Sequence, residues 1–311
     1  MVRRVDATTG AVDWTFEAAE RIDSALAVED DRVYFADWAG IVYALDDGGH
    51  EIWTHDLQAA VDASPSIDAE GRIWIGDLLG FLHVFSRDGD LQQSYDLEAP
   101  VVSAATIAAH NDGWSLFIAT ADDKVHCFSD GNDPNSVTLQ GEVGFDLALT
   151  DDGDAIATTE NGGIARVSPA CEIVWQENLT WATLMPAIMG DGDDLWVWGH
   201  NRQFYRLDAN TGATDDQWGA PIRSNATTAP TLTDDQRVLV STQGVVSFDG
   251  SDSLILTDLD AMDSPVLTEG AAFVTTERGV VLRLAGSWPS LGQSSWPTQH
   301  GNLARTGRLE F

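Results

Sequence analysis

The chain has 311 residues, of which 43% are hydrophobic and 9% aromatic, so it holds ample material for a packed core and lacks the composition of a disordered chain. Fifty Asp and Glu residues stand against sixteen Lys and Arg residues, which gives a formal net charge of −34. Because affinity for nucleic acids and anionic membranes depends on Lys and Arg meeting phosphates, this balance excludes both as partners.

Cysteine content and hydropathy limit the class of protein further. Cys127 and Cys171 lie far apart in the sequence, so we expect neither a metal knuckle nor a dense disulfide framework. No apolar run approaches the roughly 20 residues that span a bilayer, and the basic residues near the N-terminus precede no apolar segment, so we expect neither a membrane insertion nor a signal peptide. Acidic residues are spread through the turns, which favours the hypothesis of a surface adapted to high salt.

Short strands are predicted from the N-terminus onward. Residues 2–16, VRRVDATTGAVDWTF, predict two strands joined by a turn. The next period predicts four strands, over residues 24–30, 31–37, 41–46 and 50–57. Each is a short run containing Val, Ile, Tyr or Trp, and the turns between them are rich in Asp and Gly. No segment shows the sustained apolar period of a helix.

The third strand of this unit recurs along the chain. Its seven occurrences begin at Gly40, Gly80, Asp123, Gly162, Arg202, Gln243 and Arg278, at spacings of 35 to 43 residues. A four-stranded unit of about 40 residues that repeats in this way is typical of a β-propeller. We therefore predict an all-β fold, a seven-bladed β-propeller of four-stranded antiparallel blades. Eight blades are the alternative, if Val2–Val5 belongs to a blade whose first half is missing.

The two ends of the chain predict how the propeller closes. The last repeat has three good strands and no convincing fourth, whereas the N-terminal strand Ala11–Phe16 has no complete repeat of its own. We predict that this N-terminal strand pairs with the last blade as its outer strand. Residues 1–311 would then form a single domain, with residues 1–16 as the closing segment, 17–295 as the repeats and 296–311 as a C-terminal latch.

Tryptophan spacing carries a family resemblance. A Trp follows a turn Gly by four residues in DATTGAVDW (6–14) and DDGGHEIW (46–53), Cys171 takes the Gly position in PACEIVW (169–175), and two residues are inserted in DANTGATDDQW (208–218). This pattern resembles the repeat of the pyrroloquinoline-quinone-type (PQQ-like) propellers. The resemblance implies that the four tryptophans dock between neighbouring blades: Trp14, Trp53, Trp175 and Trp218.

The PQQ-like resemblance implies several functions. The family contains quinone-dependent dehydrogenases, non-catalytic outer-membrane assembly lipoproteins, and propellers of cell surfaces and sensors. The dehydrogenases carry adjacent bridged cysteines and a compact calcium set of Glu, Asn and Asp, and this sequence shows neither. We therefore expect a non-catalytic binding or scaffold module for protein or polysaccharide partners, in a periplasmic or cell-surface setting, as a monomer or a module of a larger assembly. The alternatives are a small PQQ-dependent oxidoreductase and a propeller hydrolase or lyase acting on polysaccharide.

Candidate binding residues are expected where loops meet at one face of the propeller, around the channel mouth. Carboxylates end the second strand or precede the first strand of several repeats, and one segment, residues 196–206, is rich in aromatic and basic residues. The candidates are Asp23, Asp37, Asp62, Asp77, Asp263, His200, Arg202 and Tyr205. Oxygen ligands of this kind suit calcium, so calcium is possible here, whereas no other cofactor and no PQQ is expected. The alternative is that these carboxylates cap turns and that residues 196–206 form an ordinary hairpin.

The segment WPTQHGNLARTG at residues 296–307 resembles a closing segment of PQQ-like surface propellers. The matching positions are Trp296, Pro297, Thr306 and Gly307. Because this segment follows an incomplete last repeat, we predict that it closes the structure as a latch rather than forming a catalytic site.

Overall fold

The structure, a computed structural model, describes most of the chain. The described residues are 1–110, 113–129, 134–179, 185–190, 192–199, 201, 203–219, 230–233, 237–241, 245–248, 253–257, 264–268, 271–276, 280–285 and 308–310. They form strands, turns and loops without a helix. The chain divides into two compact units, of which the first comprises Met1–Thr138 with Ala304–Phe311 and the second comprises Leu139–Leu303.

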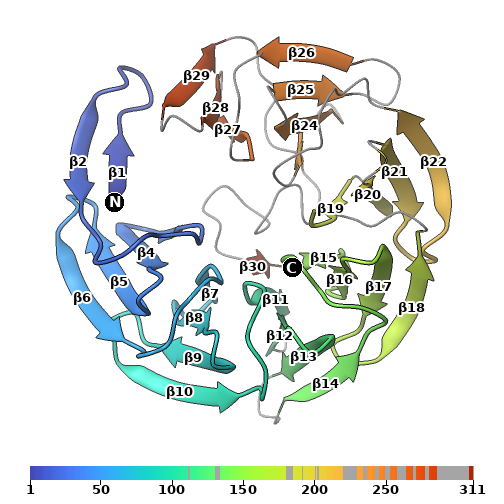
Figure 1. The fold of residues 1–311 in the computed structure, drawn as a ribbon, viewed down its shortest axis with the longest axis horizontal. Coiled ribbons are helices and arrows are strands. Elements are labelled where there is room, and N and C mark those ends of the chain that lie inside the picture. Colours follow the sequence, from blue (N-terminus) through green and yellow to red (C-terminus); the bar gives the residue numbers. More distant parts are fainter. Residues whose placement is uncertain are drawn as a thin grey trace. The chain divides into compact units, whose positions relative to one another are not determined.

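Within the first unit, one two-stranded sheet and three larger sheets follow one another in chain order (Figure 1). The two-stranded sheet is formed by β1 (Val2–Val5) and β2 (Val12–Phe16). Blade 1 contains β3 (Ala27–Glu29), β4 (Arg32–Ala36), β5 (Ile41–Asp46) and β6 (Glu51–Asp56). Blade 2 contains β7 (Ser66–Ile67), β8 (Ile73–Gly76), β9 (Phe81–Phe85) and β10 (Leu91–Asp96). Blade 3 contains β11 (Thr106–His110), β12 (Gly113–Thr120), β13 (Lys124–Ser129), β14 (Asn135–Thr138) and, from the C-terminus, β30 (Arg308–Glu310).

The second unit repeats the same sheet. Blade 4 contains β15 (Ala148–Leu149), β16 (Ala155–Thr158), β17 (Gly163–Val167) and β18 (Ile173–Asn178). Blade 5 contains β19 (Ile188–Met189), β20 (Asp194–Gly199), β21 (Gln203–Asp208) and β22 (Thr214–Gly219). Blade 6 contains β23 (Thr231–Leu232), β24 (Val238–Ser241), β25 (Val245–Phe248) and β26 (Ser253–Thr257). A three-stranded sheet contains β27 (Val266–Thr268), β28 (Ala271–Thr275) and β29 (Val281–Ala285).

The predicted four-stranded antiparallel blade is confirmed, but the predicted number of blades is wrong. Among the described residues six sheets have four strands or more, and the sheets at the two ends of the series have two and three strands. Neither seven nor eight complete blades are therefore present in the described part of the chain. In each blade the strands pair in chain order, so we name them A to D.

The N-terminal strand pairs differently from the prediction. Strand β2, which was expected to complete the last blade, pairs antiparallel with β1, with Val2 opposite Phe16 and Arg4 opposite Trp14. A local turn explains the preference: Asp6 Oδ1 accepts hydrogen bonds from the amides of Thr8 and Thr9 at 3.0 and 2.6 Å. A hairpin closed by so few residues costs far less loop entropy than pairing across the whole chain.

Each blade buries its middle strands and exposes its outer strand. Along β5 and β9 four successive residues are buried, whereas most residues of β6 and β10 are exposed or half-buried. A strand buried on both faces loses the polar alternation of a one-sided sheet, which explains the continuous apolar runs of the B and C strands. Between blades 1 and 2 these runs form one core cluster that includes Tyr34, Ile73 and Phe85, with Trp53 packed against it.

Three of the predicted docking tryptophans contact the C–D turn of the following blade. The indole Nε1 atoms of Trp14, Trp53 and Trp175 donate to the backbone carbonyls of Asp47, Arg87 and Ala209 at 2.9, 3.0 and 2.8 Å. A turn glycine lies directly on each ring: a Cβ at Gly49 (φ 79°) would stand 2.5 Å from Trp14, and one at Gly89 (φ 93°) would stand 2.7 Å from Trp53. The backbone of the fourth, Trp218, lies on β22 opposite Phe204, and its side chain lies outside the described residues.

Cys127 on β13 and Cys171 in the β17–β18 turn are both disulfide-bonded, so neither is a free thiol. Cys171 has a φ of 64° in the turn position that Gly occupies in other blades. The sequence spacing gave no sign of this bonding, because disulfide formation depends on how closely two Cα atoms approach in the fold.

Removing the docking ring of Trp53 tests the contact between blades 1 and 2. Because this half-buried ring packs on Gly89 and donates to Arg87, we expect Trp53→Ala to lower the free energy of unfolding by about 2–4 kcal/mol. Trp53→Phe should cost less, since it loses the N–H bond and retains an aromatic ring. The matched control is Leu91→Ala, because Leu91 is 44% exposed on β10 and its loss should cost under about 0.5 kcal/mol. Denaturant unfolding at constant salt measures all three, and equal losses for Trp53→Ala and Leu91→Ala would contradict the docking role.

Candidate binding surface

Carboxylates at the end of strand B cap the B–C turns. Asp37 follows β4, and its Oδ1 accepts hydrogen bonds from the amides of Ala39 and Ile41 at 3.0 and 3.1 Å. Asp77 follows β8 in the same way, and its Oδ1 accepts from Leu79 and Phe81, both at 2.9 Å. Both aspartates are almost fully buried, with exposed fractions of 0% and 1%.

The second oxygen of each capping aspartate meets a side chain six residues later. Asp37 Oδ2 accepts from the Tyr43 hydroxyl at 2.9 Å, and Asp77 Oδ2 lies 3.0 Å from His83 Nε2. Burial raises the pKa of Asp77, but the hydrogen bonds from His83 and from the turn amides outweigh it, and the net pKa is lowered. Of the two interpretations of these carboxylates, the geometry favours turn capping over a role as exposed calcium ligands.

Blade 3 uses a neutral version of the same cap. Thr120 takes the place of the aspartate, and its Oγ1 donates to Asp122 at 2.6 Å and lies 3.0 Å from His126 Nε2. Burial lowers the pKa of His126, and the nearby Lys124 charge adds to this effect against the opposing charge of Asp122. In blade 3 a hydroxyl–imidazole pair therefore replaces the carboxylate–imidazole pair of blade 2.

The loops before strand A carry the exposed candidates. Asp23 pairs with Arg21, whose Nε lies 2.9 Å from Asp23 Oδ2, and the Arg21 guanidinium lies 4.3 Å from the centre of the Trp38 ring. Asp62 occupies the corresponding loop of blade 2. Partial burial and the neighbouring charge of Asp23 raise the pKa of Asp62 against the opposing charge of Arg21.

These loops are tied to the B–C turns of the same unit. The Trp38 amide donates to the Arg21 carbonyl, and the Leu78 amide donates to the Ala60 carbonyl, both at 2.9 Å. Leu79, next in this turn, is 65% exposed and is the most exposed large apolar residue of those described. We define the loop surface by five residues that these loops and turns carry: Arg21, Asp23, Trp38, Asp62 and Leu79.

The aromatic and basic segment of blade 5 is only partly described. Tyr205 lies on β21, buried to an exposed fraction of 1%, and its hydroxyl donates to Gln203 Oε1 at 2.8 Å and accepts from Asn201 Nδ2 at 2.5 Å. Burial raises its pKa against the effect of the Asn201 bond. Tyr205 thus has partners within its own hairpin, as the alternative interpretation proposed. Three other candidates lie outside the described residues: His200, Arg202 and Asp263.

No group of three or more His, Cys, Asp or Glu side chains within the described ranges is placed to hold a metal ion. Calcium binding stays a prediction from the sequence. The predicted latch residues Trp296, Pro297, Thr306 and Gly307 lie outside the described part of the chain. Of the predicted tail, β30 is described, and it pairs with β11 of blade 3.

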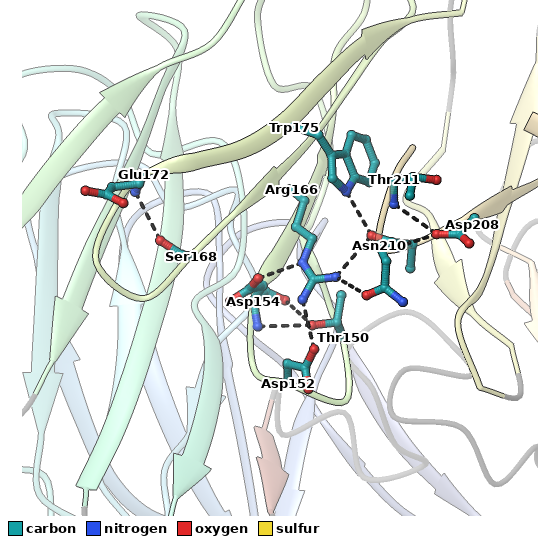
Figure 2. A network of polar contacts seen from close by, with 11 residues as sticks. Thr150, Asp152, Asp154, Arg166, Ser168, Glu172, Trp175, Asp208, Asn210 and Thr211 are labelled. Atoms are coloured by element: carbon teal, nitrogen blue, oxygen red, sulfur yellow. Dashed lines mark hydrogen bonds and ion pairs between the residues drawn. The ribbon is translucent and has the colours of Figure 1, made fainter. Parts of the chain in front are cut away.

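A buried arginine that the sequence did not single out joins blades 4 and 5 (Figure 2). Arg166 on β17 is only 6% exposed, and its Nε donates to Asp154 Oδ2 at 2.6 Å. One terminal nitrogen donates to the Asn210 side chain at 2.8 Å and to the Ala209 carbonyl at 3.2 Å, the same carbonyl that the Trp175 indole reaches. The other terminal nitrogen lies 3.0 Å from Asp152. Residues 151–154 (DDGD) have the Asp and Gly content of a turn, but no feature of them indicates that an arginine from another strand binds there.

The N-terminal repeats also match a known family model. Residues 1–92 match the model described as outer membrane protein assembly factor BamB. The PQQ-like resemblance is confirmed. The family match covers the two-stranded sheet, blade 1 and the first three strands of blade 2.

Solved structures extend the PQQ-like likeness in fold. BamB from Moraxella catarrhalis is 14% identical and covers 89% of each chain, with a TM-score of 0.72. The computationally designed Ika8 protein is 14% identical over 91% of this chain and 89% of its own, with a TM-score of 0.71. BBS1N, crystallised in complex with ARL6DN, is 14% identical over 70% of this chain and 73% of its own, with a TM-score of 0.56.

At these identities the likenesses show the fold alone, an all-β β-propeller with four-stranded antiparallel blades. The comparison with curated proteins found no match. No helix among the described residues is long and apolar enough to cross a membrane.

Replacing Arg166 tests the buried network of Figure 2. Arg166→Met leaves Asp154 buried without its cation, so we expect the free energy of unfolding to fall by about 3–5 kcal/mol. The double variant Arg166→Met/Asp154→Asn should recover much of this loss, because no uncompensated charge is left. Denaturant unfolding of the two variants measures the difference. A double variant as unstable as the single one would show that charge pairing is not what Arg166 contributes.

Acidification tests the buried imidazole of blade 3. The folded pKa of His126 is lowered, so the unfolded chain takes up its proton first as the pH falls below about 6.5. The stability associated with neutral His126 is present above that pH and is lost as the pH falls toward the folded pKa. We expect His126→Gln to flatten the decline in melting temperature between about pH 6.5 and pH 5, whereas the control His50→Gln, at an exposed residue, should not. Parallel pH profiles for all three proteins would contradict this origin.

Proposed function

We propose that the chain is a non-catalytic scaffold that binds a protein partner through the loop surface of its first unit. The observation that carries the proposal is the composition of this surface, where an exposed Leu79 lies in the same set of loops as an Arg21–Trp38 stack. Arginine and tryptophan are enriched at the energetic centres of protein interfaces, and an exposed apolar residue such as Leu79 is stabilised when a partner covers it.

The charges of the loop surface favour a partner with basic side chains. Asp23 and Asp62 are exposed carboxylates of the same charge, so they repel each other. Partial burial is the larger cause of the raised pKa of Asp62, and the neighbouring charge of Asp23 adds to it. A Lys or Arg from a partner would relieve this repulsion, and the chain's net charge of −34 would speed its approach. A polysaccharide, which the sequence left as an alternative partner, offers no such cation.

Two further observations support an exported or cell-surface setting. The first is the match of residues 1–92 to a family model described as an outer membrane protein assembly factor. The second is that Cys127 and Cys171 are both disulfide-bonded, since disulfides persist in oxidising compartments and are rare in reducing ones. Within such a setting the chain would act as a monomer or as one module of a larger assembly.

The oxidoreductase alternative is tested directly. Purified protein mixed with pyrroloquinoline quinone, calcium, an alcohol or sugar and a dye acceptor should show no turnover if the chain is a scaffold. Melting curves with and without calcium, recorded on the same sample, test the predicted calcium site. Dye reduction dependent on the quinone would contradict the non-catalytic proposal.

Site-specific photo-crosslinking tests the loop surface. A photoactivatable residue at Leu79 should form protein adducts in cells of the native host, whereas the same residue at Leu91, exposed on the outer strand β10, should form few. Adding Asp23→Lys with Asp62→Lys should reduce the Leu79 adducts at least about tenfold, because a basic partner would then meet positive charges where it now meets two exposed carboxylates. Equal adducts at Leu79 and Leu91, or adducts unaffected by these two substitutions, would place the partner elsewhere.

A further inference from the structure

The first strand of blade 3 differs from its counterparts. β11 has five residues, whereas the first strands of the other described sheets of three or more strands have two or three. Its one edge pairs antiparallel with β12, and its other edge pairs in parallel with β30, with Ile107, Ala108 and Ala109 opposite positions 308, 309 and 310. Blade 3 is thus the one described blade that carries a strand from a distant part of the chain.

The length of β11 explains why a strand is added here. A sheet edge offers a row of backbone N–H and C=O groups, and an edge of two residues is too short to hold an extended segment. Ala108 and Ala109 leave little bulk beside the backbone of β11, so another backbone can approach closely. The pairing uses main-chain groups, which any extended peptide possesses.

A cavity lies beside this edge. Its volume is about 300 Å³, and its lining includes Ile107, Ala109 and Trp114 from blade 3 with Asp68, Glu70 and Arg72 from blade 2. Ile107 and Ala109 are the register partners of positions 308 and 310. Because successive residues of a strand face opposite sides, a segment added in this register places its first and third residues on the face that borders the cavity.

The polar groups of the cavity are held in place by one another and by two neighbouring rings. Arg72 lies 2.6 Å from Asp68 and 2.8 Å from Glu70, and its guanidinium lies 5.5 Å from the ring centres of both Trp74 and Trp114. Two carboxylates against one guanidinium leave the cavity with one net negative charge. A basic side chain that enters the cavity would neutralise this charge.

We propose that the edge of β11 that pairs with β30 is a docking site for an extended, basic peptide segment of a partner protein, and that the chain's own β30 occupies this site in competition with that segment. The proposal rests on the scaffold function above and names a second contact for it, reached by strand addition rather than through the loop surface. The chain's own segment meets the requirement for a basic residue at one of its two positions on the face that borders the cavity, since position 308 is an arginine and position 310 is a glutamate. A partner segment with basic residues at both positions would fit better.

A peptide of residues 304–311, blocked at both ends and labelled with a fluorophore, is the probe. A variant lacking residues 308–311 should bind it in fluorescence anisotropy, and the full chain should bind it at least about tenfold more weakly, because the tethered β30 competes at a high effective concentration. Hydrogen exchange should show new protection at residues 106–110 and none at the short first strand β7. No binding to the shortened variant, or protection elsewhere, would overturn the proposal.

Peptide N-methylation separates strand addition from side-chain binding. In a parallel pair only alternate amides of the added strand point toward its partner. Two methylated peptides are compared with the unmethylated parent. The first carries a methyl group on the amide nitrogen of residue 309, and the second carries one on each amide nitrogen of residues 308 and 310. One of the two should bind like the parent, and the other should bind at least about tenfold more weakly. Equal affinities would contradict strand addition.

The full chain provides a measurement that does not depend on the shortened variant. Hydrogen exchange of the unmodified protein should show alternate protection at residues 308–310, and excess unlabelled peptide should remove it. Protection unchanged by peptide would overturn the competition. If the peptide does not bind but the Leu79 crosslinks form as expected, the docking site at β11 is refuted and the loop surface stands. If the peptide binds but the Leu79 crosslinks do not form, the loop surface is refuted as a partner site and the docking site at β11 stands.

Discussion

The contact between a tryptophan and the glycine turn of the next sheet is the constraint on which the rest of the structure depends. At Trp14, Trp53 and Trp175 the ring lies against a C–D turn of the following sheet, and the indole N–H donates to a turn carbonyl. The ring leaves no room for a Cβ at Gly49 or Gly89, where the backbone also has a positive φ. One contact therefore sets both the separation of neighbouring blades and the residue type of their turns.

Close docking of the blades determines which polar residues are available for function. Burying the B and C strands on both faces leaves the ends of these strands inside, so the turns there need their own hydrogen-bond acceptors. Asp37 and Asp77 satisfy that need with both carboxylate oxygens. The carboxylates at the ends of the B strands therefore stabilise the fold and are not available to a partner. The side chains that can contact a partner are those that precede strand A or protrude from the turns.

The sequence predicted features that repeat and missed features that occur once. Local sequence patterns that recur in the repeats predicted three features: the 40-residue period, the four strands of each blade, and the positions of Trp14, Trp53 and Trp175. The sequence indicated two strands joined by a turn in residues 2–16, but it assigned the second strand to the last blade, because pattern alone does not weigh a six-residue turn against closure across the chain. The Arg166 network and the β11–β30 pair each join residues far apart in sequence, so only the folded chain brings their partners together.

The β1–β2 hairpin has a consequence for the order of folding. A two-stranded sheet is barely stable in water by itself, and this one is held by Trp14 on the turn at Gly49 and by ion pairing of Arg4 with Asp47. During synthesis the hairpin leaves the ribosome before the turn that secures it, because that turn lies more than thirty residues later in the sequence. The hairpin therefore gains its stabilising contacts only after blade 1 has formed.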